Sequence, residues 1–292
     1  MRSGSFDPLN IMENTVVTRP GRHLMLAEVP RTAFEFANLA ISAPFLGLAP
    51  RGDGHPVLVM PGLGGSDLST AVIRGYLDLL GYQTFPWEMG RNLGPAMPNL
   101  AKRLGELLTR IFEDSGERKV SLVGWSLGGV YARLLAQMLP DKVRSVATLG
   151  SPFSGSPSSG ERSTTVYPLV ERFVGMPMEE VPVNYLRLLA GEPLPGIPST
   201  AVFSRTDAIV PWQIATQAPS HFAENIEVFA SHTGLGFSPA VLFALADRLQ
   251  HAEGEWQPFR RTGWKTGVYG PARLATVSTS KGAAWTRVPA GV

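Results

Sequence analysis

The sequence contains no cysteine, and its charges are few and nearly balanced. Without cysteine the chain can form no disulfide, no thiolate metal site and no cysteine nucleophile. Charged residues make up 17% of the chain and the formal net charge is +2. A balance this even does not favour nucleic acid or a strongly anionic substrate as a partner, so we expect no nucleic-acid partner.

Long apolar runs are also missing. The most apolar early stretch, residues 37–50, is interrupted by Asn38, Ser42, Pro44 and Gly47, and it is too short to span a bilayer. The N-terminal residues lack the continuous apolar segment of a secretory signal. We therefore expect no transmembrane segment and, by default, a cytoplasmic protein.

What the sequence does contain, from residue 56 onward, is an alternation of short apolar runs with amphipathic stretches. The expected strands are 56–60, 82–87, 119–123, 143–149, 197–203 and 226–229, and the expected helices are 66–80, 95–112, about 127–139 and 240–249. This alternation is typical of a mostly parallel sheet crossed by helices, an α/β fold. With 44% hydrophobic residues, the 292-residue chain can fill one core.

The two ends of the chain lack this pattern. We expect a catalytic domain over 56–250, preceded by an extension, 1–55, that packs on the core. Residues 1–33 show no clear period, and 34–48 are expected to pack as a helix against the sheet or, alternatively, to form an interfacial surface on lipid. In the tail, 251–292, the only charged residues after Glu255 are basic, and we expect it to be poorly ordered.

One pentapeptide follows the third strand directly. Gly124-Trp125-Ser126-Leu127-Gly128 fits the G-x-S-x-G nucleophile elbow, in which a tight strand-to-helix turn exposes a serine hydroxyl. The flanking glycines leave room for that turn. Because an apolar strand precedes the motif and a helical pattern follows it, the context favours an elbow over an ordinary glycine-rich loop.

A nucleophilic serine needs a base and a carboxylate that orients the base. Asp207 follows the fifth expected strand and His232 follows the last, so both lie at carboxyl ends of strands, where sites of open α/β sheets collect. The chain order is then Ser126, Asp207, His232. The other histidines either precede the nucleophile or lie away from strand ends, and they fit less well.

A second glycine-rich turn, Pro61-Gly62-Leu63-Gly64-Gly65, closes the first strand. Backbone amides in such a loop can face the serine and form an oxyanion hole, and we assign the donors to the Leu63 and Leu127 N–H groups. A phosphate-binding loop is the alternative, but no Lys-Ser or Lys-Thr pair follows the glycines.

Together these motifs resemble those of the α/β-hydrolase superfamily, specifically its bacterial serine esterase- and lipase-like members. The segments that carry the resemblance are 61–65, 124–129, 150–152, 207–211 and 231–235. The resemblance implies a mostly parallel central sheet with helices on both faces, a helical cap or lid inserted at about 153–197, and an acyl-enzyme formed on Ser126. Pro61 is a departure, because many lipases carry a histidine before that glycine.

The resemblance also directs the functional prediction. We expect a carboxylic ester hydrolase that prefers an apolar acyl chain, acts on a small-molecule or lipid ester and needs no metal or organic cofactor. The alternatives are an acyltransferase that uses the same acyl-enzyme and a non-catalytic binding protein on the same fold. The predicted substrate-binding residues are Trp125, Phe153, Tyr167, Val170, Phe173 and Leu186.

Overall fold

The computed structural model describes residues 20–154, 170–173, 175–177, 180–181, 185 and 191–271. Its centre is a six-stranded sheet in the order β2-β1-β3-β4-β5-β6, in which every neighbouring pair is parallel. The strands are β1 (Pro56–Met60), β2 (Gln83–Phe85), β3 (Val120–Trp125), β4 (Val143–Leu149), β5 (Ser199–Phe203) and β6 (Ala223–Glu227). The predicted mostly parallel α/β fold is thus confirmed.

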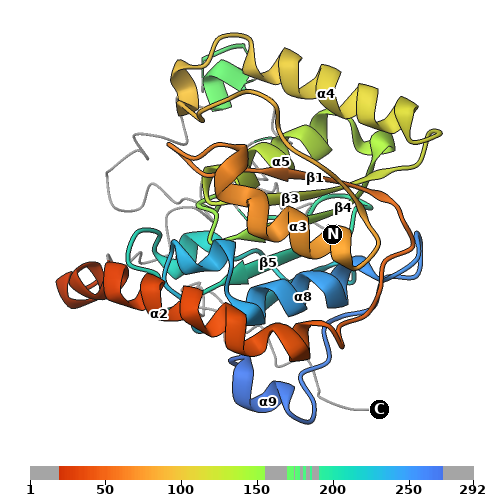
Figure 1. The fold of residues 1–292 in the computed structure, drawn as a ribbon. Coiled ribbons are helices and arrows are strands. Elements are labelled where there is room, and N and C mark those ends of the chain that lie inside the picture. The colour runs from red at the N-terminus through yellow and green to blue at the C-terminus, as the bar shows by residue number, and fades with distance from the viewer. Residues whose placement is uncertain are drawn as a thin grey trace, which may run out of the picture.

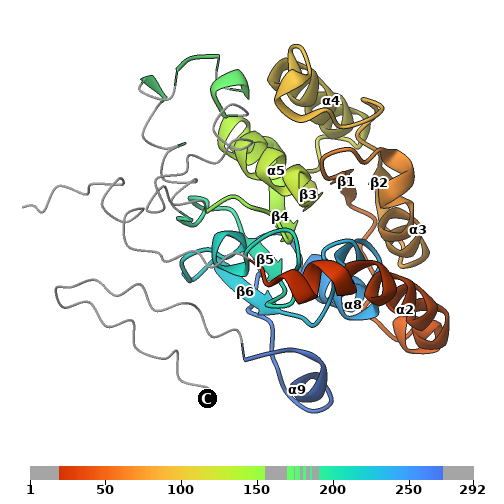
Figure 2. The same ribbon diagram turned by 90° about the vertical axis from the view of Figure 1, so that its left-hand side faces the viewer.

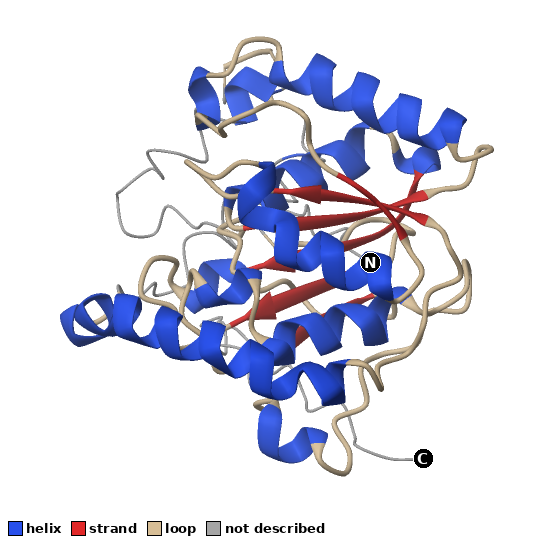
Figure 3. Cartoon of the chain, in the orientation of Figure 1, coloured by secondary structure: helices blue, strands red, loops and turns tan. Residues whose placement is uncertain are grey.

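Helices cover both faces of this sheet (Figures 1 and 3). One apolar cluster joins α4 (Leu100–Asp114) and α5 (Leu127–Met138) to side chains such as Leu58 and Leu122. The other joins α3 (Ala71–Leu79) and α8 (Pro239–Leu249) to Val57 and Val59. Because successive strand residues point to opposite faces, β1 contributes to both clusters, which explains its five consecutive buried residues.

Several element boundaries differ from those expected. The helix predicted over 66–80 divides into a 3-10 turn, η1 (Asp67–Thr70), and α3, and the one predicted from residue 95 divides into η2 (Gly94–Ala96) and α4. Pro98 disfavours helical backbone before it, so α4 begins after the left-handed residue Asn99. β6 begins three residues earlier than expected, because its first half contains the polar residues Glu224 and Asn225, which an apolar run does not include.

The N-terminal extension contains a helix longer than expected. α2 (Arg22–Leu46) begins within the stretch for which no period was found, and its main contacts are with α8 and η6 (Gly234–Gly236). The expectation that 34–48 packs on the sheet is therefore corrected: α8 lies between α2 and most of the sheet (Figure 2). Within the described ranges, no helix is long and apolar enough to cross a membrane.

The start of the basic tail is also ordered, contrary to expectation. Residues 251–271 are described and include α9 (Lys265–Val268). Lys265 pairs with Asp247 of α8 at 2.5 Å, and the buried Tyr269 donates a hydrogen bond to the Ala240 carbonyl. The residues from 272 onward lie outside the described part.

Candidate active site

The nucleophile elbow has the strained geometry that its motif predicts. Ser126 lies between β3 and α5 with φ 53° and ψ −122°, a conformation that a non-glycine residue rarely adopts. A Cβ atom on Gly124 would lie 2.3 Å from the Gly128 carbonyl oxygen, and one on Gly128 would lie 2.3 Å from that of Met60. Both glycines are therefore required for the close approach of α5, β3 and β1.

The structure brings Ser126, His232 and Asp207 together. His232 Nε2 lies 3.0 Å from Ser126 Oγ, and His232 Nδ1 lies 2.7 Å from Asp207 Oδ2. The carboxylate is buried, and its other oxygen accepts hydrogen bonds from the Ile209 and Val210 amides at 2.8 and 2.7 Å. In the neutral imidazole, Nδ1–H donates to Asp207 and Nε2 accepts the serine proton, which is the arrangement that general-base catalysis requires.

The loop after β1 borders the same serine. A Cβ atom on Gly62 would lie 3.6 Å from Ser126 Oγ, so the backbone of this loop passes directly beside the hydroxyl. The amides of Ser126, Gly64 and Gly65 donate to backbone carbonyls. Among the described residues, the Leu63 and Leu127 amides have no acceptor, so both remain available to a ligand oxygen.

Asn92, which the sequence prediction missed, holds this loop in place. It is fully buried, and its side-chain Nδ2 donates to the Pro61 carbonyl at 2.9 Å. Its Oδ1 accepts hydrogen bonds from the Gly94 amide at 3.0 Å and from the Tyr131 hydroxyl at 2.9 Å. Its backbone exchanges two further hydrogen bonds, each of 2.7 Å, with Gly64 and Gly65.

The neighbouring Arg91 also contacts this loop. Its Nε donates to the Gly64 carbonyl at 2.9 Å, so it is bound to the loop as well.

Helix α2 supplies a second group of missed residues. Glu35, which is buried, accepts hydrogen bonds from the Ser231 amide at 2.7 Å and from the Ser231 hydroxyl at 2.5 Å. Glu28 accepts one from the Thr233 amide at 2.9 Å. The backbone on both sides of His232 is thereby attached to carboxylates of α2.

The acid loop is attached to the same helix. The Arg31 guanidinium donates to the Thr206 carbonyl at 2.7 Å and to the Thr206 hydroxyl at 2.8 Å. Thr206 directly precedes Asp207, so α2 contacts the loops of both predicted partners of Ser126.

The predicted substrate-binding residues have different environments. Trp125 donates its indole N–H to the His232 carbonyl at 3.2 Å and packs near Gly236, so its ring supports the base loop. Phe153 is buried under the Arg133 guanidinium, 4.2 Å from the ring centroid. Val170 and Phe173 are buried in the cluster of α4 and α5. Tyr167 and Leu186 lie outside the described residues.

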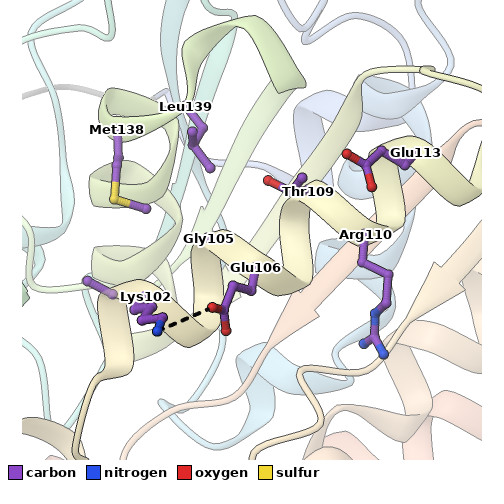
Figure 4. A pocket seen from close by; sticks show the side chains of 9 residues that line it. Lys102, Gly105, Glu106, Thr109, Arg110, Glu113, Met138 and Leu139 are labelled. Carbon is purple, nitrogen blue, oxygen red and sulfur yellow. Dashed lines mark ion pairs between the residues drawn. The ribbon is translucent and has the colours of Figure 1, made fainter.

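A hollow of about 420 Å³ lies elsewhere, between α4 and the end of α5 (Figure 4). Its rim carries an ion pair between Lys102 and Glu106 at 3.8 Å, and its floor includes Met138 and Leu139. None of its lining residues belongs to the loops of Ser126, Asp207 or His232. This hollow is therefore separate from the candidate active site.

Comparison with known proteins agrees with this fold. Residues 56–182 match the family model described as alpha/beta hydrolase fold. Triacylglycerol lipases of Pseudarthrobacter phenanthrenivorans and Burkholderia plantarii are both 29% identical over 109 residues, which are 35% of this chain and 34% and 30% of theirs. The chain thus spans about a third of the length of these curated relatives.

Among solved structures, the lipase B of Aspergillus fumigatus is similar, with a TM-score of 0.50 and 18% sequence identity. The similarity covers 73% of this chain and 55% of the lipase. Together with the family match over residues 56–182, the parallel sheet and the elbow that follows β3 show that the chain has an α/β-hydrolase fold.

Proposed function

We propose that the protein is a serine hydrolase that cleaves carboxylic esters, with Ser126 as nucleophile, His232 as general base and Asp207 as the group that orients the base. The observation that carries the proposal is the continuous hydrogen-bonded chain from Ser126 Oγ through His232 to the buried Asp207 carboxylate. The lipase names of the relatives favour an ester as the substrate and an apolar acyl group.

In the proposed cycle, His232 takes the Ser126 proton as Oγ attacks the ester carbonyl carbon. The tetrahedral oxyanion accepts hydrogen bonds from the Leu63 and Leu127 amides. His232 then donates its proton to the leaving alcohol, and the C–O ester bond breaks to give an acyl-enzyme. Water, deprotonated by His232, attacks this acyl-enzyme and releases the carboxylic acid.

The strain at Ser126 supports this assignment. Backbone in that region of φ and ψ costs on the order of 1–3 kcal/mol, and it persists only where the surroundings determine it. Here the surroundings are the close contacts of Gly124 and Gly128, which keep the hydroxyl at the start of α5. The amide dipoles at that helix start stabilise developing negative charge.

The test is hydrolysis of p-nitrophenyl esters from acetate to palmitate by the wild type, Ser126→Ala and Asp207→Asn. We expect kcat to fall by about 10⁴-fold or more in both variants, with the fold retained. Ser220→Ala is the matched control, because this serine is exposed and precedes the start of β6, whereas Ser126 follows the end of β3. Hydrolysis that persists in Ser126→Ala would contradict the proposal.

The same assay separates hydrolysis from acyl transfer. If an added alcohol accelerates the release of p-nitrophenol and the product is a new ester of that alcohol instead of the free acid, the protein is an acyltransferase. Unchanged release with free acid as the product supports a hydrolase.

A further inference from the structure

Helix α2 distributes its side chains in the reverse of the usual pattern for a surface helix. All exposed side chains of residues 24–48 are apolar, whereas the charged residues of that range, Glu28, Arg31 and Glu35, face the protein. Six large members of the exposed set are between 67% and 83% exposed: Leu26, Val29, Phe34, Ile41, Phe45 and Leu48. We call this outer surface the apolar face of α2.

The charged inner side prevents α2 from turning its apolar face inward. Glu28 and Glu35 are hydrogen-bonded to the His232 loop, and Arg31 is bonded to the Asp207 loop. Rolling the helix would remove the partners of the Ser231 and Thr233 amides and of the Thr206 carbonyl, at a cost of about 1–3 kcal/mol for each group left unsatisfied. The apolar face therefore stays exposed along a 25-residue helix, which is about 37 Å at 1.5 Å per residue.

The position of α2 relates this face to the candidate active site. The N-terminal half of the helix reaches beyond the edge of the sheet at which the strands end (Figures 1 and 2). Two exposed apolar residues lie there on the loops that α2 contacts: Phe229, 74% exposed, and Ile209, 59% exposed. The Arg31 guanidinium lies 5.2 Å from the centroid of the Phe229 ring, so helix and loop are in contact.

The charged residues at the two ends of the face are basic. Arg22 lies at its first end and Arg51 lies beyond its second, and both are exposed. Between them no carboxylate is exposed, because Glu28 and Glu35 face inward, and the exposed Asp53 that follows Arg51 is paired with Arg144 at 2.9 Å. An apolar helix surface with cations at its ends complements an anionic lipid surface, in which acyl chains lie beneath negative head groups.

We propose that the apolar face of α2 seats the protein on an anionic lipid surface, with the mouth of the candidate active site turned toward it. This inference deepens the proposed function and rests on it for the substrate, since it makes an ester in a lipid phase the substrate class. A water-soluble monomer rarely exposes a contiguous apolar patch of this length unless the patch binds something.

The experiment is flotation of the full-length protein with vesicles of equal parts phosphatidylcholine and phosphatidylglycerol, and with vesicles of phosphatidylcholine alone. The wild type is expected to float with the anionic vesicles. The double variant Leu26→Glu/Ile41→Glu is expected to partition about 100-fold less, because each leucine or isoleucine withdrawn from the lipid weakens binding about tenfold. Arg22→Gln/Arg51→Gln is expected to reduce the preference for anionic over neutral vesicles.

Leu68→Glu is the matched control, because Leu68 and Leu26 are both 83% exposed but Leu68 lies on η1. This variant is expected to bind as the wild type does. All substituted side chains are exposed, and circular dichroism verifies that the variants are folded.

Three results would overturn the proposal. One is a wild type that does not float with either vesicle. Another is equal loss of binding in Leu68→Glu, which would show that the loss in Leu26→Glu/Ile41→Glu is not specific to α2. The third is a wild-type dimer in solution that Leu26→Glu/Ile41→Glu converts to a monomer, because a second copy would then cover the face. Flotation needs no ester, so its outcome is independent of whether the protein hydrolyses esters.

Discussion

Replacing Asn92 by alanine should damage both the stability and the activity of the protein. The side chain makes three hydrogen bonds, to Pro61, Gly94 and Tyr131, and all lie in the interior. At a net value of about 1 kcal/mol each, their loss should lower the free energy of unfolding by about 3 kcal/mol. Urea denaturation at constant m-value measures this change.

The expected effect on activity comes from the loop that Asn92 holds. Without the Nδ2 donor the Pro61 carbonyl is released, and the Leu63 amide moves away from the oxyanion position. Loss of one such donor costs about 3 kcal/mol of transition-state stabilisation, so kcat should fall by about 10²-fold while KM changes little. Initial rates on a soluble p-nitrophenyl ester below the unfolding temperature measure both constants.

Tyr131→Phe is the matched control. It removes the hydroxyl from the same buried network but leaves the bonds from Asn92 to Pro61 and Gly94. We expect a loss of stability of about 1 kcal/mol and less than about a threefold change in kcat. If Asn92→Ala loses stability yet keeps its kcat, Asn92 only supports the fold, and the reasoning about the loop is refuted.

Further predictions concern α2, the far end of the sheet and the elbow. Glu35→Ala should lower kcat and leave KM nearly unchanged, because the Ser231 amide and hydroxyl lose their acceptors beside His232. Glu35→Gln should recover most of the activity. Equal kcat values in the wild type and both variants would contradict this prediction. Burial, followed by the charge of Arg144, lowers the pKa of His55 from 6.5 to about 4. As the pH falls, the unfolded chain therefore binds this proton before the folded protein does. The free energy of unfolding should fall by about 2 kcal/mol between about pH 7.5 and about pH 5. If the free energy of unfolding of His55→Gln depends on pH in the same way as that of the wild type, His55 is not the cause. Gly128→Ala should destabilise the protein and abolish hydrolysis, because its Cβ would meet the Met60 carbonyl. Gly75→Ala on α3, whose Cβ would have nothing within 4 Å, should raise the free energy of unfolding by about 0.5–1 kcal/mol. A melting temperature that rises in Gly128→Ala or falls in Gly75→Ala would contradict the corresponding prediction.

Local sequence signals were sufficient to predict most of the strands of the sheet and the residues that the structure places around Ser126. The strands predicted at 56–60 and 143–149 have the same bounds in the structure. The run at 56–60 is apolar throughout, because both faces of that strand are covered. Ser126, Asp207 and His232 each follow a strand, and parallel strands end at one edge, so strand order alone predicts that they approach one another.

The role of α2 could not be predicted in the same way. Periodicity assigns apolar residues to the buried face, whereas this helix exposes them and turns its charged residues inward. The partners of Glu28 and Glu35 are Thr233 and Ser231, about 200 positions away, so no local window contains the interaction. A charged residue recurring at helical spacing within an otherwise apolar stretch was the available signal.

Asn92 and the start of the tail illustrate two other limits. An asparagine in a loop of glycine and proline is ordinarily a turn residue, and only the fold shows that its side chain faces Pro61 and Tyr131. The basic composition after Glu255 predicts disorder, but Lys265 has a buried partner in Asp247 that composition cannot indicate.

The most direct test of the central claim is covalent labelling of the wild type with a fluorophosphonate, followed by mass spectrometry of the intact protein and its peptides. Phosphorus would occupy the position of the ester carbonyl carbon, so an activated serine is required whatever the natural ester. We predict one adduct per chain, on Ser126, formed rapidly by the wild type and absent in Ser126→Ala and in His232→Ala. A folded wild type that takes up no label, or that takes it up on another residue, would contradict the account.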